Sequence, residues 1–461
     1  MVRNHLAGFL EQARESGVPH FVDKELRAYL RCGVLAHGFC RLQCGGCNYE
    51  LLVPFSCKGR GFCPSCGGKR MTDLALHLTE HVIPYVPVRQ FVLSIPHRLR
   101  YLLAYDHARC LAVLRIVARA IFGFYRRRES KGTPAARRTG AVMFLQRFGS
   151  AGNLNLHFHI LVLDGVFAEA AGEPLRFHAA APPTDQAIAQ LLVTIRRRIL
   201  RHLARCASAQ QEADSADRLG DEAPLLAACY STSIGGRRTL GARAGTPLAR
   251  IGADAKAPQL ERRGRLQAHV DGFDLHAALR VSAQHPRGRA PLENVVKYCA
   301  RPPIAHDRLS ELPDGRIALR LKTPWSDGTT HVLHEPVDFI AKLAALIPRP
   351  RKNLVLYHGV LAAHCKWRAR VVCFGRSEPS GAASSRTQVP GDPASMRPRR
   401  AQWARTDAPR LRLRAADVSL LWRQVEAARV HPGSSFDSED PDCARTTRGA
   451  AAACESLALA L

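Results

Sequence analysis

Residues 154–164 read LNLHFHILVLD and follow GAVMFLQRF at residues 140–148, with the turn-bearing stretch FGSAGN joining the two runs. Apolar, β-branched and aromatic runs separated by such a stretch predict two strands. Side chains two positions apart point to the same face of a strand. We therefore expect His157 and His159 to project together from one face, and Phe158 to enter a core on the opposite face.

Stretches typical of strands and of helices alternate around this pair. The strand-like stretches are residues 89–96, 273–281 and 317–323, and those with helical periodicity are residues 106–128, 184–206, 292–300 and 336–347. This order, with several antiparallel neighbours, favours an α+β fold built on an antiparallel sheet with flanking helices. Residues 207–270 are rich in Ala, Gly and Arg and poorly periodic, which predicts an insertion or a loop.

Composition divides the chain into three parts. Seven of the fifteen cysteines fall between Cys32 and Cys66, and we assign residues 1–86 to a helical, cysteine-rich N-terminal domain. The α+β domain is expected at residues 87–372. Residues 373–461 begin as a linker rich in Ser, Pro and Gly and continue without a convincing pattern. We expect this tail to be disordered or translated out of frame.

The charge of the chain points to a polyanionic partner. Lys and Arg number 67 against 39 Asp and Glu, giving a formal net charge of +28 and a pI of about 10.2. Because Lys and Arg release counterions from a phosphate backbone, we expect DNA, with a solvated basic surface as the alternative. The sequence has no run of about 18 uncharged apolar residues and no signal-like N-terminus, so we expect no membrane partner and a cytoplasmic location.

Two Cys-x2-Cys pairs, Cys44–Cys47 and Cys63–Cys66, are separated by 15 residues. Such pairs can supply four thiolates in a tetrahedron around zinc. Cysteines in a reducing compartment also favour metal over disulfides. We therefore expect a structural Zn²⁺ on Cys44, Cys47, Cys63 and Cys66. Four nearby residues have no place in this set, and each is a core residue, a substitute ligand in this site or part of a second site: Cys32, His37, Cys40 and Cys57.

The histidine pair is a candidate half of a divalent-metal site, because two imidazoles side by side offer two neutral nitrogen ligands. The alternative is two ordinary half-buried histidines. A third ligand is needed, and Gln146 lies eleven residues before His157 on the preceding predicted strand. A hairpin of that length can place its amide oxygen beside the rings. His276 is another candidate, and a structural glutamine is the alternative for Gln146.

Tyr298 lies in ENVVKYCARPP, which predicts a short helix ended by two prolines. Glu293, Lys297 and Arg301 form a charged flank beside it at helical spacing. A tyrosine hydroxyl has a pKa near 10 and is a poor nucleophile at neutral pH. A catalytic Tyr298 therefore needs a metal and nearby cations, which Lys297 and Arg301 can supply. The ordinary alternative is a tyrosine packed in the core.

Six motifs occur in a characteristic order between about residues 20 and 370. They are SCKGRGFCPSC, RQFVLSIPHRLRYLL, QRFGSAGNLNLHFHILVLDGVF, KYCARPPI, LRLKTPWSDGTTH and YHGVLAAHCKWR. Taken together they resemble the bacterial rolling-circle transposases of the insertion sequence 91 family, which belong to the His-hydrophobe-His superfamily of single-strand nucleases. This family carries an N-terminal zinc-binding domain, which the cysteine-rich module resembles.

The resemblance implies that His157 and His159 hold a catalytic Mg²⁺ or Mn²⁺ and that Tyr298 attacks the scissile phosphate. It implies a 5′-phosphotyrosine link, a free 3′-OH, and single-stranded or hairpin DNA at element ends as the partner. It also supports Gln146, because related nucleases often place a third ligand about ten residues before the pair. Residues 87–372 are then the catalytic domain. The rival function is a zinc-dependent DNA-binding protein without activity, or an inactivated transposase relic.

Two departures from the family pattern bear on the mechanism. Many members carry two tyrosines four residues apart on this helix, and here the earlier position is Asn294. The chain is similar in this respect to the single-tyrosine branch associated with common-region elements. The resemblance also ends after about residue 403, in the tail that we expect to be disordered or out of frame.

Overall fold

The computed structural model describes residues 1–12, 18–43, 50–128, 136–169, 174–210, 217–254, 264–376 and 427–428. The chain divides into two compact units: one comprises Met1–Leu26 and Arg60–Arg376, and the other contains Arg27–Gly59. Most of the predicted tail lies outside the described residues. In the part of the chain that the structure describes, no helix has the length and apolar character needed to cross a membrane.

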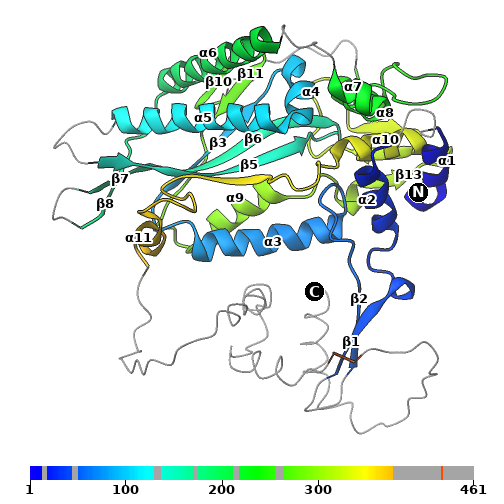
Figure 1. The fold of residues 1–461 in the computed structure, drawn as a ribbon, viewed down its shortest axis with the longest axis horizontal. Coiled ribbons are helices and arrows are strands. Elements are labelled where there is room, and N and C mark those ends of the chain that lie inside the picture. Colours follow the sequence, from blue (N-terminus) through cyan, green and yellow to red (C-terminus); the bar gives the residue numbers. More distant parts are fainter. Residues whose placement is uncertain are drawn as a thin grey trace. The chain divides into compact units, whose positions relative to one another are not determined.

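An antiparallel sheet of seven strands forms the centre of the larger unit (Figure 1). Its order is β10-β11-β3-β6-β5-β16, and β12 also pairs with β3. The strands are β3 (Val88–Ser94), β5 (Gly140–Phe148), β6 (Leu154–Leu163), β10 (Gln267–Val270), β11 (Phe273–His276), β12 (Arg280–Val281) and β16 (Val355–Gly359). Every pairing is antiparallel, which confirms the predicted α+β fold.

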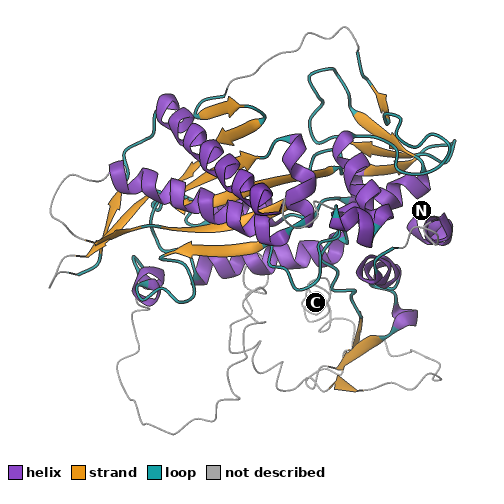
Figure 2. Cartoon of the chain, turned by 45° about the horizontal axis from the view of Figure 1, so that its top comes forward, coloured by secondary structure: helices purple, strands orange, loops and turns teal. Residues whose placement is uncertain are grey.

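Helices cover both faces of this sheet (Figures 1 and 2). One face packs against α4 (His97–Tyr105), α5 (His107–Arg128) and α6 (Asp185–Gln210), and the other against α3 (Pro64–His81), α9 (Ala290–Ala300) and α11 (Arg368–Cys373). The alternation along β6 produces this division. Phe158 and Ile160 enter the core under α5 and α6, whereas Leu161 and Leu163 enter the core under α3 and α9. The two histidines therefore face α9.

Smaller elements complete the two units. Two further sheets have the orders β13-β14-β15-β9 and β4-β7-β8, and a third pairs β17-β1-β2. Their strands are β1 (Phe39–Gln43), β2 (Glu50–Pro54), β4 (Ala136–Arg138), β7 (Gly165–Glu169), β8 (Arg176–Ala179), β9 (Ala249–Ile251), β13 (Leu309–Glu311), β14 (Ile317–Arg320), β15 (His331–His334) and β17 (Ala427–Ala428). The remaining helices are α1 (Val2–Gln12), α2 (His20–Leu30), α7 (Arg218–Glu222), α8 (Pro224–Gly235) and α10 (Pro336–Leu346).

The prediction of a loop at residues 207–270 needs correction, whereas that of an insertion stays a prediction. This stretch contains the helices α7 and α8 and contributes β9 and β10 to two sheets. In α8, Leu226 and Tyr230 are almost fully buried. The helix is apolar nearly all round, so its sequence lacks the amphipathic period by which a surface helix is recognised. The poor periodicity of this helix in the sequence thus reflects its burial.

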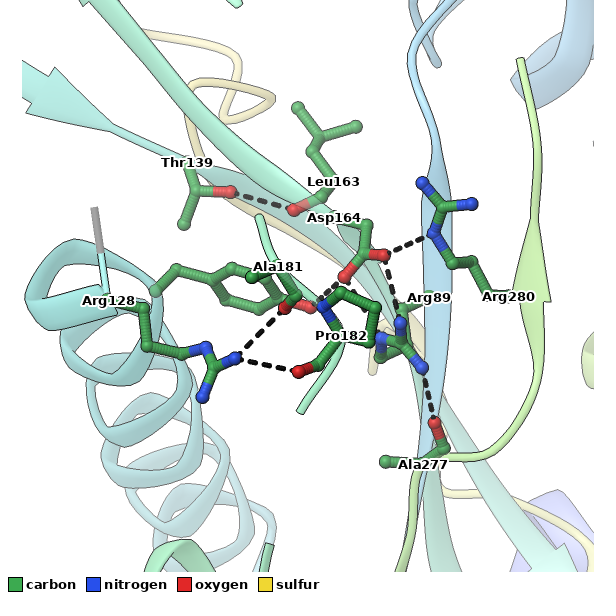
Figure 3. Close-up of polar contacts among 10 residues, drawn as sticks. Arg89, Arg128, Thr139, Leu163, Asp164, Ala181, Pro182, Ala277 and Arg280 are labelled. Carbon is green, nitrogen blue, oxygen red and sulfur yellow. Dashed lines mark hydrogen bonds and ion pairs between the residues drawn. The ribbon is translucent and has the colours of Figure 1, made fainter. Parts of the chain in front are cut away.

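A buried cluster of charged residues lies where β3 begins and β6 ends (Figure 3). Asp164, just after β6, is 1% exposed and accepts hydrogen bonds from Arg89 Nε at 3.0 Å and Arg89 Nη2 at 3.1 Å. It also accepts from Arg280 Nε at 2.7 Å and from the Tyr125 hydroxyl at 2.8 Å. Arg89, 3% exposed, donates in turn to the carbonyl oxygen of Ala277 at 3.0 Å. One carboxylate thus joins β3, β6, β12 and α5.

Candidate metal and nucleophile site

The register of the β5–β6 hairpin places three polar side chains on one face. Gln146 lies directly opposite His157, and His159 lies two residues further along β6. Residues opposite each other in antiparallel strands point to the same face. His276 is aligned with Val92 and through it with His159, two strand spacings or roughly 10 Å away. Of the two expected third ligands, Gln146 is therefore the one that adjoins the histidines.

The two imidazoles lie close together, with ring centroids 5.0 Å apart. Nδ1 of His157 donates to the carbonyl oxygen of Asn155 at 3.0 Å, which leaves a lone pair on Nε2. Burial lowers the pKa of His157, and it lowers that of His159 to about 3, with the neighbouring charge of His157 and Arg301 acting in the same direction. Both rings are therefore neutral at pH 7, the form in which imidazole binds metal.

Two buried polar atoms in this group lack a hydrogen-bond partner: Nε2 of His159 and Oε1 of Gln146. Such atoms are rare in folded proteins, because leaving one unpaired costs about 1–3 kcal/mol. Oε1 of Gln146 can donate a lone pair to a cation, and so can Nε2 of His159 when the ring proton is on Nδ1. The residues present therefore fit a divalent metal held by His157, His159 and Gln146, and their role as ligands stays a prediction.

Helix α9 brings Tyr298 to the histidines. The helix ends at Ala300, since Pro302 disfavours helical geometry at Arg301, which adopts φ −56° and ψ 150°. The rings of Tyr298 and His159 meet edge to face, with centroids 5.5 Å apart. Gln146 Nε2 donates to the carbonyl oxygens of Cys299 at 2.6 Å and Tyr298 at 3.2 Å, which ties the end of the helix to β5. Tyr298 itself is 42% exposed, so it is not a core tyrosine.

The cations beside Tyr298 differ in part from those expected. The Arg301 guanidinium lies 4.7 Å from the centre of its ring, and Nζ of Lys322 lies 5.0 Å from it. Lys297 instead forms an ion pair with Glu293 at 2.8 Å. Lys322 follows β14 in the motif LRLKTPWSDGTTH, and nothing in the local sequence links it to Tyr298. Asn294 is exposed one turn before Tyr298.

Gln90 on β3 is a further member of the site that the sequence did not indicate. Its side chain is 6% exposed. Its Nε2 lies 2.9 Å from Nδ1 of His159 and 3.2 Å from Sγ of Cys299. It therefore connects the histidine strand to the tyrosine helix. The only available signal was a glutamine within the apolar run RQFVLSIP.

A separate group of four cysteines could hold one metal ion, since the sulfur atoms of Cys32, Cys57, Cys63 and Cys66 lie within 4.8 Å of one another. Cys63 is the N-cap of α3 and Cys66 lies in its first turn, where the helix dipole favours negative charge. The backbone nitrogen of Cys57 donates to Sγ of Cys32 at 3.3 Å.

Two of the four predicted zinc ligands, Cys63 and Cys66, belong to this group. The other two, Cys44 and Cys47, lie outside the described residues. Cys32 and Cys57, which the sequence left as surplus cysteines, stand in the group with them. Of the alternatives left open for these two, membership of a metal site is the one that this arrangement favours over packing in the core.

Comparison with protein families identifies the class of protein. A family model described as a putative transposase matches residues 140–368, which contain the β5–β6 hairpin and α9. The protein is therefore a transposase, a class that implies DNA binding and DNA cutting. A model of the transposase zinc-binding domain of insertion sequence 91 matches residues 1–95. The chain belongs to the insertion sequence 91 family of transposases and has an N-terminal module that, with its cysteine group, supports structural Zn²⁺. No curated protein and no solved structure matches it.

Proposed function

We propose that this transposase nicks and rejoins single-stranded or hairpin DNA at element ends, through a 5′-phosphotyrosine intermediate in rolling-circle transposition. Residues 87–372 are the proposed catalytic domain. The proposal rests on one observation: an exposed tyrosine lies beside buried atoms that could bind a metal ion and that have no hydrogen-bond partner. Tyr298 lies 5.5 Å from His159 between ring centres, and Nε2 of His159 and Oε1 of Gln146 have no hydrogen-bond partner.

His157, His159 and Gln146 would hold Mg²⁺ or Mn²⁺, which when bound supplies positive charge at the scissile phosphate. The chain itself provides the nucleophile and two cations. Tyr298 is open to solvent, and Arg301 and Lys322 lie against its ring. Preorganised positive charge at this position stabilises the charge that develops on the phosphate oxygens and on the tyrosine oxygen. In this proposal Arg301 and Lys322 supply the cations, whereas Lys297 is paired with Glu293.

The proposed reaction exchanges one phosphodiester for another. The Tyr298 oxygen bonds to phosphorus, its proton is lost to solvent, and the bond from phosphorus to the 3′ oxygen breaks. That oxygen takes a proton and becomes the free 3′-OH. In the rejoining step an incoming 3′-OH attacks the phosphotyrosine and releases Tyr298. Because Asn294 stands where a second tyrosine would be, the same hydroxyl must serve each cleavage in turn.

The test is to incubate the full chain with single-stranded oligonucleotides of element-end sequence and Mn²⁺, labelled at either the 5′ or the 3′ end. We expect a denaturation-resistant protein–DNA adduct that carries the 3′ label, because the fragment downstream of the nick keeps its 5′ phosphate on the tyrosine. An adduct carrying the 5′ label would contradict the proposed polarity. If no terminal sequence, linear or hairpin, gives an adduct, the protein binds DNA without cutting it and the proposal is wrong.

A further inference from the structure

The outer surface of α5 and α6 is strongly cationic and lies on the sheet face opposite to the histidines. Helix α5 contains no Asp or Glu, and α6 contains only Asp185 at its first position. Eight of their arginines are exposed, namely Arg127 and seven others: Arg115, Arg119, Arg126, Arg197, Arg198, Arg201 and Arg205. We call these seven others the α5–α6 arginine surface.

Helical geometry aligns these arginines in two stripes. Residues 115, 119 and 126 fall on one side of α5 over about 16 Å, and residues 197, 201 and 205 follow one side of α6 over about 12 Å. Both helices bury their other sides in the same core beneath the sheet face. They also pack against each other (Figures 1 and 2). The two stripes therefore belong to one exposed surface.

Ion pairs within the described residues do not compensate this charge. Arg109 and Arg196 form ion pairs with Asp106 and Asp271, whereas none of the seven arginines of this surface does so with a carboxylate of the described chain. Like charges one helical turn apart destabilise a helix, and surface helices usually intersperse the two signs. A helix surface that contacts only solvent does not require such an excess of positive side chains. A surface that binds a polyanion does require it, because each arginine can neutralise a phosphate.

We propose that the α5–α6 arginine surface binds the sugar–phosphate backbone of duplex DNA, apart from the strand held at the tyrosine. Arginine suits this role because its guanidinium donates two hydrogen bonds to phosphate. An anionic membrane is the weaker partner, because membrane-surface helices expose an apolar face and the apolar sides of α5 and α6 lie in the core. This inference goes beyond the proposed reaction, which needs only the opposite face of the sheet.

The test compares two full-length variants that each remove four positive charges. One is R197Q/R198Q/R201Q/R205Q. The matched control is R3Q/R176Q/R218Q/R287Q, at exposed positions on other elements. Binding to a short duplex of arbitrary sequence is measured against salt concentration. Each lost phosphate contact reduces the slope of log affinity against log salt by about 0.9. We expect the α6 variant to lower this slope by about 2–4, and the control to change it by less than about 1.

Equal slopes for the two variants would overturn the proposal. So would an α6 variant that keeps duplex affinity but loses binding to phosphatidylserine vesicles or to duplex RNA, since either result assigns the surface to another partner. Glutamine keeps a good helix propensity, and circular dichroism checks that both variants retain wild-type helix content. The experiment measures only DNA binding, so its result does not depend on whether Tyr298 forms a covalent adduct.

A second inference concerns the hydrogen bond between Gln90 and His159, and it rests on the proposed metal site. As the Gln90 amide stands, its NH₂ group donates to Nδ1 of His159 and to Sγ of Cys299. The ring proton then sits on Nε2, the unpartnered nitrogen. A half-turn of the amide brings its oxygen to the same place, where it accepts the Nδ1 proton and the thiol proton. Nε2 is then free to bind metal.

We infer that Gln90 is a positioning residue that selects the metal-binding tautomer of His159. Partners of this kind hold the ligand ring in orientation, and their loss typically costs 10–100-fold in metal affinity. A methionine at this position would fill a similar volume without accepting a proton, whereas a glutamate would keep an acceptor. We therefore expect Gln90→Met to weaken Mn²⁺ binding by about 10–100-fold, measured by calorimetry on zinc-loaded protein, and Gln90→Glu to retain it.

The matched control is Gln267→Met in the same sheet, which removes a hydrogen bond of 2.9 Å to Asp274, away from the site. Wild-type Mn²⁺ affinity in Gln90→Met would overturn the inference, as would equal losses in Gln90→Met and Gln90→Glu. His159→Ala separates this result from the proposed function. If His159→Ala loses Mn²⁺ and Gln90→Met does not, only the role of Gln90 is wrong. If wild type itself binds no Mn²⁺, the metal site is wrong as well.

Discussion

Replacing Tyr298 by phenylalanine should abolish the covalent protein–DNA adduct while leaving the fold intact. The change removes only the hydroxyl oxygen that would bond to phosphorus. The surrounding contacts are made by the ring: the edge-to-face contact with His159 at 5.5 Å, and the cations of Arg301 at 4.7 Å and Lys322 at 5.0 Å. Phenylalanine keeps these contacts, so the loss would report on chemistry and not on folding.

The chain offers a matched control in Tyr85. Tyr85 is 37% exposed, against 42% for Tyr298, and it also has two arginines over its ring, Arg289 at 4.3 Å and Arg376 at 5.6 Å. Tyr85→Phe should form the adduct at the wild-type rate, measured by gel shift of labelled oligonucleotide under denaturing conditions. An adduct that persists in Tyr298→Phe would show that another residue is the nucleophile.

Much of the site was accessible from the sequence because it follows from local rules. Strand periodicity placed His157 and His159 on one face, and the short connection to the preceding strand placed Gln146 beside them. The helix ending before Pro302 follows from the steric restriction that proline imposes on the residue before it. These features depend on residues close in the chain. The mutual orientation of such residues is set by backbone geometry alone.

The members that the sequence missed depend on packing between distant segments. Lys322 reaches Tyr298 from the segment after β14, and Gln90 reaches His159 from β3. Neither has a local pattern that distinguishes it from a surface lysine or a chance glutamine. The cysteine group shows the same limit. The Cys-x2-Cys spacing predicted Cys63 and Cys66 as ligands, but Cys32 lies in the same group from a position that no short motif includes.

Replacing Asp164 by asparagine should lower the free energy of unfolding by about 3–5 kcal/mol, because it leaves a buried arginine without its counterion. Arg89 is 3% exposed and makes two of its hydrogen bonds to this carboxylate, at 3.0 and 3.1 Å (Figure 3). Asparagine keeps the shape of the side chain but offers one acceptor oxygen and no charge. The hydroxyl of Tyr125 and the guanidinium of Arg280 compete for that oxygen.

The control for this prediction is Asp271→Asn, which removes the charge of an exposed ion pair. Asp271 forms an ion pair with Arg196 while 47% exposed, so solvent screens the pair and its loss should cost less than about 1 kcal/mol. Asp271 also has φ 48°, a conformation that asparagine tolerates. Urea unfolding followed by circular dichroism compares the two variants. Similar losses would mean that Arg89 finds other partners. A large loss confined to Asp164→Asn would establish that one carboxylate holds β3, β6, β12 and α5 together, and with them the strands that carry Gln90 and the two histidines.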